Sequence, residues 1–418
     1  MTPSFIWLAA SAGALSLLTP CVFPMVPITV SYFTQRASRD HGGALWSASV
    51  FAAGIVTTFT ALGLLLAVFV GATGASAFAA NPWINLLLTA LFVAFALNLF
   101  GVYQITVPTG ALNSLDALTR RQEARRPGVV GPLLMGLTFT LTSFTCTAPF
   151  VGTVLVSAAS GQWKAPAVGM LVYSIVFALP FFVLALVPQW MARLPRAGSW
   201  LASVKIVMGF VELAAAFKFL SNADLVWHWG IFTRTVVLAA WTVLAGITVA
   251  YLMASRPRSL GRLVGAVAAA AVGIWLASGL TGRTSLGDLE SFLPPAANAD
   301  LAWHLNDLPG SLAMAKSAGK PVFIDFTGYT CTNCRWMEAN IFSRPDVKAE
   351  LAHYELARLF TDGDGDMYEK QQTYQESTYN TVALPLYALV APDGHTIATF
   401  PGLTRNPAEF IAFLKRGL

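Results

Sequence analysis

Long apolar stretches constrain this chain more than any other feature. A membrane-crossing helix needs about 20 mostly apolar residues, and the 418-residue chain is 56% hydrophobic and only 11% charged. Soluble domains carry about 25% charged residues. We therefore predict a polytopic α-helical membrane domain over residues 1–283. Its eight predicted spans are residues 5–33, 45–70, 84–106, 130–157, 165–188, 199–220, 232–253 and 260–281.

Basic residues collect in alternate loops between these spans. The first, third, fifth and seventh loops contain Arg36, Arg39, Arg120, Arg121, Arg125, Arg126, Arg193, Arg196, Arg256, Arg258 and Arg262. Positive loops stay in the cytoplasm, so we expect both termini on the opposite side. Residues 290–418 carry a net charge of −5, against an overall charge of +5. This split indicates basic membrane loops joined to an acidic domain, and it gives no indication of nucleic-acid binding.

The four cysteines form two candidate dithiol pairs. Cys21 and Cys146 lie singly in apolar stretches, and each is followed three residues later by a proline. Cys331 and Cys334 form a Cys-x-x-Cys motif in the polar C-terminal segment. One pair in lipid and one in water suggest a protein that moves reducing equivalents through a membrane.

The membrane part also contains an internal repeat. Residues 17–24 resemble residues 141–149, and residues 92–97 resemble residues 210–215. Spans one to three and four to six are then two copies of one unit, and three spans per copy make the repeat inverted, with two further spans added. Such repeats place their site near mid-membrane on interrupted helices. The cysteines could instead be apolar fillers, but their matching positions favour a functional pair.

Glu212 is the only acidic residue within a predicted span. Carboxylates inside a membrane are costly and usually functional, so Glu212 could relay a proton when the cysteines change redox state. It could also pair with Lys205 or Lys218 and be structural. Both interpretations remain open at this point.

The C-terminal part has the pattern of a redox domain. A predicted linker, residues 284–301, contains Pro294-Pro295 with alanine, asparagine and aspartate, and its composition is typical of an extended and mobile segment. In the domain over residues 302–418, an apolar strand at 321–326 precedes the Cys331/Cys334 motif, and a helical stretch follows it. Strand, Cys-x-x-Cys and helix in this order are typical of the thioredoxin fold. At a helix N-terminus Cys331 gains thiolate character, and Cys334 can resolve a mixed disulfide.

These motifs together resemble the DsbD family of thiol:disulfide interchange proteins, with a CcdA-like membrane domain and a C-terminal thioredoxin-like α/β domain. The resemblance implies a protein-disulfide reductase of the bacterial inner membrane that uses cysteine pairs and no bound cofactor. Electrons pass from cytoplasmic thioredoxin through Cys21 and Cys146 to Cys331 and Cys334, and then to periplasmic disulfide proteins. The sequence does not choose among cytochrome c maturation, disulfide isomerase reduction and metal-stress tolerance.

The resemblance also implies roles for residues near the motif. Asp325, six residues before Cys331, and Glu338, four after Cys334, are expected to tune the pair and handle protons. Pro385 is expected to be a cis-proline that faces the motif and orients an incoming strand.

Three features depart from the family pattern. The chain starts directly at its first span, so we expect no N-terminal periplasmic domain. Thr330 stands before Cys331 in place of the usual tryptophan, which affects partner choice and redox potential. The acidic segment with Asp362, Asp364 and Asp366 echoes a calcium loop but lacks glycine at the sharp turn, and we predict a solvated surface loop.

A second function class fits parts of the sequence. The membrane part could be a small-solute transporter with a tethered thioredoxin-like chaperone or sensor domain. That hypothesis leaves the matched cysteines of the two repeats unexplained. The five histidines are scattered, and no clustered Cys and His residues indicate a metal site.

Overall fold

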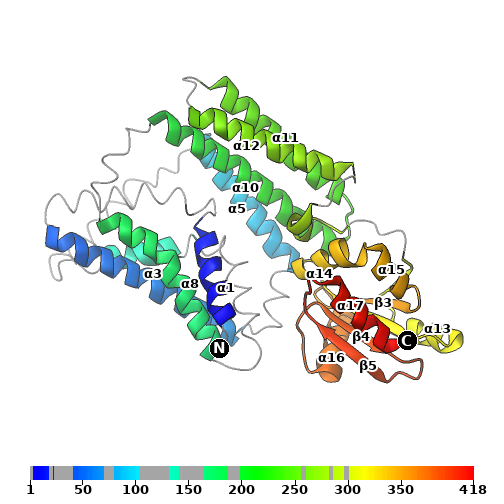
Figure 1. Ribbon diagram of the computed structural model, residues 1–418. Helices are drawn as coiled ribbons and strands as arrows, with labels where there is room; N and C mark the ends of the chain where they lie inside the picture. The colour runs from blue at the N-terminus through cyan, green and yellow to red at the C-terminus, as the bar shows by residue number, and fades with distance from the viewer. Residues whose placement is uncertain are drawn as a thin grey trace. The chain divides into compact units, whose positions relative to one another are not determined.

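The computed structural model describes residues 3–17, 22, 41–69, 80–102, 131–140, 143, 164–186, 198–255, 260–281, 286–295 and 301–418. It forms two units, each of which is considered by itself (Figure 1). The first combines Met1–Ala72 with Ala94–Glu212, and the second combines Thr73–Val93 with Leu213–Leu418.

The described membrane part consists of helices with short turns at their ends. Its labelled helices are α1 (Pro3–Ser16), α3 (His41–Phe69), α5 (Pro82–Phe100), α8 (Lys164–Leu186), α10 (Gly198–Trp227), α11 (Arg234–Ala254) and α12 (Leu260–Leu280). Four helical segments among the described residues are long and apolar enough to cross a membrane. They are Trp46–Leu65, Pro82–Phe100, Arg234–Ala254 and Leu260–Leu280. The helical membrane domain is therefore confirmed, whereas the count of eight spans and the inverted repeat stay predictions.

An aromatic core holds the first unit together. Phe59 packs edge-on against Phe177 of α8 at 5.1 Å between ring centroids, and Phe51 packs against Phe139 at 6.1 Å. The Tyr173 hydroxyl donates to Ser16 Oγ at 2.7 Å, inside the protein. Because edge-to-face aromatic pairs add stability beyond their buried area, α1, α3 and α8 pack as one group.

Helix α10 extends beyond the range predicted for its span. The prediction ended at residue 220, but the helix continues to Trp227 and includes Asp224. The Asp224 carboxylate accepts hydrogen bonds from the N–H groups of Ile231 and Phe232, at 3.2 and 2.9 Å. The acidic side chain ties the end of α10 to the turn before α11, and Glu212 is not the only carboxylate of this helix.

Part of the predicted linker is folded. A 3-10 helix, η1 (Gly287–Phe292), lies within residues 284–301, which the sequence suggested to be extended. Glu290 of η1 forms a salt bridge of 2.7 Å with Arg234 at the start of α11. Leu286 and Leu293 pack with apolar side chains of α11 and α12. Two leucines therefore anchor the start of the segment to α11 and α12.

Residues 301–418 form an α/β domain around a five-stranded sheet of order β1-β3-β2-β4-β5. The strands are β1 (Trp303–Leu305), β2 (Val322–Thr327), β3 (Glu355–Phe360), β4 (Leu386–Val390) and β5 (Thr396–Pro401). β1, β3 and β2 are parallel to one another, and β4 is antiparallel to β2 and β5. Strand β2 is buried along its whole length, as expected for a strand covered on both faces.

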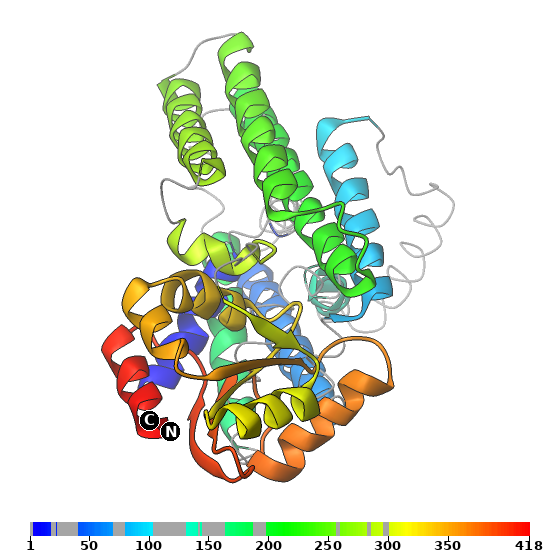
Figure 2. The ribbon, with the colours of Figure 1, turned by 90° about the vertical axis from the view of Figure 1, so that its right-hand side faces the viewer.

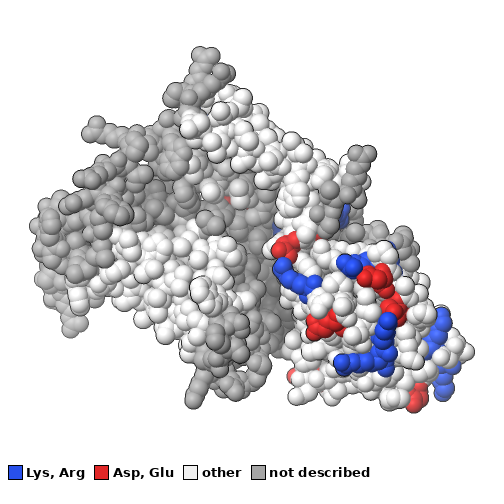
Figure 3. All heavy atoms as spheres, in the orientation of Figure 1, with Lys and Arg blue, Asp and Glu red and all other residues white. Residues whose placement is uncertain are grey.

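Helices cover both faces of this sheet (Figure 2). One face packs against α14 (Thr332–Met337), η2 (Glu338–Phe342), α15 (Pro345–Leu351) and α17 (Pro407–Leu414). The other face packs against α13 (Leu308–Ala318) and α16 (Asp366–Tyr379). On the face drawn in Figure 3, charged side chains gather over this domain, and the described membrane helices there show few. The strand and the helix predicted around the Cys-x-x-Cys motif are confirmed.

Candidate active site

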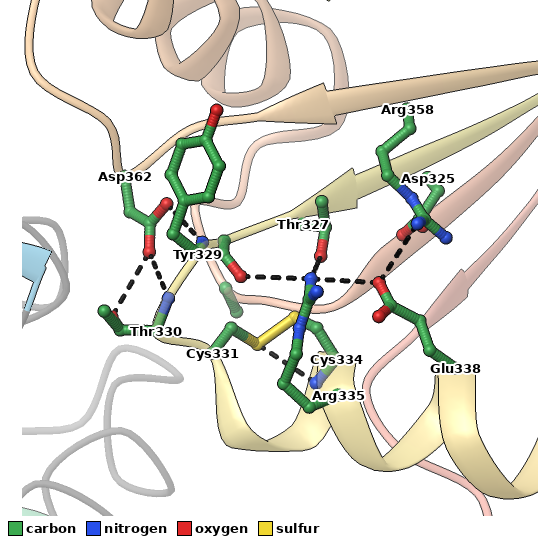
Figure 4. Close-up of a disulfide and its surroundings, with 12 residues drawn as sticks. Asp325, Thr327, Tyr329, Thr330, Cys331, Cys334, Arg335, Glu338, Arg358 and Asp362 are labelled. Atoms are coloured by element: carbon green, nitrogen blue, oxygen red, sulfur yellow. Dashed lines mark hydrogen bonds and ion pairs between the residues drawn. A yellow bond between two sulfur atoms is a disulfide. The ribbon is translucent and has the colours of Figure 1, made fainter. Parts of the chain in front are cut away.

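A disulfide joins Cys331 and Cys334 where β2 leads into α14 (Figure 4). Cys331 caps the N-terminus of α14, and its Sγ accepts the backbone N–H of Cys334 at 3.2 Å. Cys331 is partly exposed, whereas Cys334 is buried with 1% of its surface exposed. The accessible sulfur is the one that another thiolate can attack, and the buried sulfur is the one that leaves.

Asp325 lies on the central strand β2, whose end leads into the loop that carries Cys331. It pairs with Arg358 across the parallel β2–β3 ladder, and Arg358 Nε donates to Asp325 Oδ2 at 2.9 Å. Burial raises the pKa of Asp325 to about 6, Arg358 opposes this rise, and the charge of Glu338 adds to it. The carboxyl group can therefore exchange a proton near neutral pH.

Glu338 completes a buried group of four charges. It is the first residue of η2, and its Oε1 lies 2.9 Å from Arg335 and 3.4 Å from Arg358. Arg335 also donates to Thr327 Oγ1 and to the carbonyl oxygen of Gly328, at 3.1 and 3.3 Å (Figure 4). The two guanidinium groups neutralise the two carboxylates, which burial otherwise makes costly.

The sequence did not predict Arg335 or Arg358. The sequence contained only indirect indications of these arginines. A buried carboxylate needs a partner of opposite charge, and Arg358 is a charged residue within the mostly apolar strand β3, Glu355–Phe360. Strand register decides which arginine meets Asp325, and register is a property of the folded sheet.

Pro385 precedes β4, and the Leu384–Pro385 peptide is cis, as the resemblance implied. The antiparallel ladder pairs Leu386 with Phe326 at the end of β2. Pro385 therefore lies at the same end of the sheet as the loop that carries Cys331. Its carbonyl oxygen accepts the N–H of Gly402, and its action on an incoming strand stays a prediction.

The prediction of a solvated acidic loop is wrong for Asp362. This side chain is buried, whereas Asp364 and Asp366 face solvent. Its carboxylate accepts hydrogen bonds from Tyr329 and Thr330, just before Cys331. Among the residues that the structure describes, no group of three or more His, Cys, Asp or Glu side chains could hold a metal ion.

Of the three predicted site residues in the membrane part, the structure describes only Glu212. Cys21 and Cys146 lie outside the described residues. Glu212 is buried in α10 with 1% of its surface exposed, and its Oε2 has no hydrogen-bond partner in the described part of the chain. Within that part, no salt bridge joins it to Lys205 or Lys218. The pairing with a lysine is not formed within the described residues, and the proton-relay role and a structural role both stay predictions.

Two family models match the chain. Residues 4–223 match the model described as cytochrome c biogenesis protein transmembrane domain, DsbD type. Residues 308–418 match a thioredoxin-like domain. The first match covers the stretch that contains Cys21, Cys146 and Glu212, and the second covers the disulfide and its charged neighbours.

Curated relatives are named thiol:disulfide interchange proteins. The DsbD protein of Vibrio cholerae is 30% identical over 363 residues, which are 84% of this chain and 57% of that protein. DsbD 2 of Pseudomonas aeruginosa is 29% identical, with 84% and 60% covered. DsbD of Cronobacter sakazakii is 31% identical, with 80% and 56% covered. The chain spans little more than half the length of these relatives, and by its transmembrane match it belongs to the DsbD-type family of cytochrome c biogenesis transmembrane proteins.

Proposed function

We propose that this protein is a transmembrane thiol-disulfide reductase of the bacterial inner membrane. It takes electrons from cytoplasmic thioredoxin at Cys21 and Cys146 and passes them to Cys331 and Cys334. Periplasmic disulfide proteins are the final acceptors, and cysteine pairs carry the electrons without a bound cofactor. The N-terminus and residues 302–418 face the periplasm in this proposal, because the arginine-rich loops favour the cytoplasm.

One observation carries the proposal. The chain has a disulfide with one accessible and one buried sulfur, Cys331 and Cys334, at the start of a helix. The same chain matches a DsbD-type membrane domain over residues 4–223. Disulfide exchange needs an accessible sulfur that a thiolate can attack in line with the S–S bond, and a membrane partner within one chain gives the domain a source of electrons.

The first half of the cycle reduces the C-terminal pair. A thiolate of the reduced membrane pair attacks Cys331 Sγ, and the Cys331–Cys334 bond breaks. Cys334 leaves as a thiolate and takes up a proton, for which the carboxyl group of Asp325 is the buried donor. The second membrane thiolate then attacks the mixed disulfide and releases Cys331. Two electrons move to the C-terminal pair, and the Cys21–Cys146 disulfide forms.

The second half reduces a client protein. The Cys331 thiolate attacks a client disulfide, and one client sulfur leaves as a thiol after protonation. Cys334 loses its proton, to Asp325 or Glu338, and attacks Cys331 in the mixed disulfide. The client then carries two thiols, and the Cys331–Cys334 disulfide is restored. Pro385 orients the client backbone beside the disulfide during this attack.

Within the membrane, Glu212 is the proposed proton relay for the Cys21/Cys146 pair. A buried carboxyl group can hold the proton that a thiol releases when it becomes a nucleophile. Substitution with Gln keeps the shape of the side chain and removes its titration. If the Glu212→Gln variant transfers electrons at the wild-type rate, Glu212 has no part in the mechanism.

The central experiment follows the redox state of Cys331 and Cys334 in cells. Thiols are trapped by acid and alkylated, and their number is read from the mobility shift of the full chain. Wild type is compared with Cys21→Ala and with Cys146→Ala, and Ser343→Ala serves as a control on the exposed end of η2. We expect the C-terminal pair to be reduced in wild type and in the control, and oxidised in both cysteine variants.

The opposite outcome is equally clear. If the C-terminal pair has the same redox state with and without Cys21 and Cys146, the two domains are not one electron path. A solute transporter with a tethered thioredoxin-like domain then becomes the better description.

A further inference from the structure

Asp362 lies against the loop that carries Cys331, yet the proposed electron path gives it no role. It follows the end of β3, and only 7% of its surface is exposed. Asp364 and Asp366, from the same acidic segment, are exposed. Of these three aspartates, only Asp362 is therefore buried beside the redox motif.

Three donors converge on this carboxylate (Figure 4). The N–H of Tyr329 donates to Oδ1 at 2.7 Å, and the N–H of Thr330 donates to Oδ2 at 3.1 Å. The Thr330 hydroxyl donates to the same Oδ2 at 3.3 Å. An ionised carboxylate only accepts hydrogen bonds, whereas a protonated one must donate one. Burial raises the pKa of Asp362, and these hydrogen bonds and the charge of Arg335 oppose that rise in part. Three donors around the two carboxylate oxygens fit the ionised form.

The loop is shaped to receive the carboxylate. A Cβ atom at Gly328 would lie 2.5 Å from Asp362 Oδ2, closer than side-chain atoms approach one another. Any other residue at position 328 would displace the carboxylate from its donors. The sequence Gly328-Tyr329-Thr330 and the distant Asp362 are therefore one structural unit.

Contacts with β3 and α16 also fix the side chain of Tyr329. Its ring stacks on Phe360 of β3, with centroids 4.1 Å apart and planes 13° apart. Its hydroxyl lies 3.1 Å from the hydroxyl of Tyr368 in α16. Both the main chain and the side chain that lead into Cys331 are thus held by residues outside the motif.

We propose that Asp362 is a positioning residue for the redox pair, because it fixes the loop before Cys331 and its negative charge disfavours the Cys331 thiolate. A nearby negative charge raises the pKa of an acid. The carboxylate also occupies the N–H groups of Tyr329 and Thr330, which are then not free to stabilise a thiolate. A pair whose thiolate is less stable is a stronger reductant. The inference rests on the function proposed above, in which Cys331 is the attacking sulfur.

The first test compares Asp362→Asn with wild type and with Asp364→Asn as the matched exposed control. The purified full chain is equilibrated with glutathione, so that one C-terminal dithiol and one oxidised glutathione give one disulfide and two reduced glutathione molecules. Trypsin cleavage after Lys316 and Arg335 isolates both cysteines in one peptide for mass spectrometry, because the Lys320–Pro321 bond resists trypsin. We expect the dithiol-to-disulfide ratio to rise about three- to tenfold in Asp362→Asn, equivalent to about half to one unit of thiol pKa, and to stay unchanged in Asp364→Asn.

The second readout is the pH profile of Cys331 alkylation in the reduced chain. Its midpoint should move to lower pH by about half to one unit in Asp362→Asn. The other charged and titratable groups near the disulfide and its loop are the same in both proteins. Among the described residues they include Asp325, Glu338, Arg335 and Arg358, together with Tyr329, Tyr368 and His228. A residue that only stabilises the fold would leave this profile where it is.

A folded Asp362→Asn variant with the wild-type ratio and the wild-type pH profile overturns the proposal. If the variant does not fold, hydrogen exchange in wild type decides. The amides of Tyr329 and Thr330 should exchange far more slowly than that of Asp364. Equal rates would show that Asp362 does not hold the loop before Cys331, and they would overturn the proposal. Glutathione replaces the membrane cysteines in these measurements. A failure of electron delivery from Cys21 and Cys146 would therefore leave this test intact and is detected separately.

Discussion

At the scale of single residues, the domain that carries the disulfide contains a buried and balanced group of four charges. Asp325 and Glu338 are opposed by Arg335 and Arg358. A buried carboxylate without a partner loses several kcal/mol of hydration, so each arginine allows an acid to stay ionised close to the cysteines. Proton transfer at Cys334 needs such an acid, and the arginines set the pH range in which it can act.

Replacing Arg358 with Met should destabilise the C-terminal domain by about 3–5 kcal/mol, because Asp325 then lacks its buried counter-charge, whereas Glu338 keeps Arg335. The matched control is Arg344→Met, which breaks an exposed pair with Asp346. Solvent and salt screen such a pair, and no change is expected. Hydrogen exchange of β2 and β3 amides in the full chain measures both effects. Equal protection in the two variants would show that Arg358 is not needed as a counter-charge.

Removing the charge of Asp325 should change how stability depends on pH. The folded pKa of about 6 is above the ordinary value of 3.8, so the native state binds the proton more tightly. The stability contributed by this group is complete below about pH 4 and is lost as pH rises through about 6. Relative to Asp325→Asn, wild type should therefore lose about 3 kcal/mol over this range.

The measurement is urea unfolding of the full chain at several pH values, read by a brief deuterium pulse on β2 at one fixed pH. Wild type and Asp325→Asn should diverge as the pH rises. Stability curves that stay parallel would mean that Asp325 does not titrate near pH 6.

The sequence identified some of these residues and not others. Cys331 and Cys334 follow from the spacing of their motif, and Asp325 and Glu338 follow from the family resemblance that the motif supports. Asp362 is 31 residues beyond Cys331, and its role depends on where β3 ends in the folded sheet. Partners that tertiary structure brings together leave no local pattern in the sequence.

At the scale of secondary structure, two asparagines end elements with a left-handed backbone. Asn380 has φ +53° and ends α16, and Asn306 has φ +57° between β1 and α13. Asn306 also accepts the N–H of Phe360 through its Oδ1 at 3.0 Å, which ties the start of the domain to β3. The two asparagines share a left-handed backbone conformation, and they differ because the side chain of Asn306 also accepts a hydrogen bond from β3.

Alanine at these two positions should therefore have unequal effects. Asn380→Ala loses only the tolerance of asparagine for this conformation, about 1 kcal/mol. Asn306→Ala loses that and also leaves the buried N–H of Phe360 without an acceptor, about 1–3 kcal/mol more. Urea unfolding of the full chain, read at β3 by hydrogen exchange, gives both values. Equal losses would mean that the hydrogen bond to Phe360 contributes nothing.

Element boundaries show where sequence patterns stop being informative. The prediction for α10 ended where polar residues begin, but the helix continues because Asp224 is satisfied by N–H groups beyond it. The predicted linker contains η1 because Leu286 and Leu293 find apolar partners on α11 and α12. In both segments, packing partners that are distant in the sequence decided the structure.

At the scale of the whole molecule, the distribution of charge determines the expected orientation. Arginines fill alternate loops of the membrane part, and residues 290–418 are acidic. Basic loops are retained in the cytoplasm, whereas acidic residues have little effect on orientation. With eight spans, the C-terminal domain lies outside the cytoplasm, and any odd count would place it inside with thioredoxin.

Reporter fusions test this orientation directly. Alkaline phosphatase folds only outside the cytoplasm, where its disulfides form, and green fluorescent protein reports the cytoplasm. Fusions after Arg126 and Pro257, in two arginine-rich loops, should fluoresce and lack phosphatase activity. Fusions after Leu280 and Leu418 should show the reverse. Because Pro257 and Leu280 flank α12 alone, opposite reporters there show that this helix crosses the membrane. A fluorescent Leu418 fusion would place the disulfide in the cytoplasm and remove the need for electrons to cross the membrane.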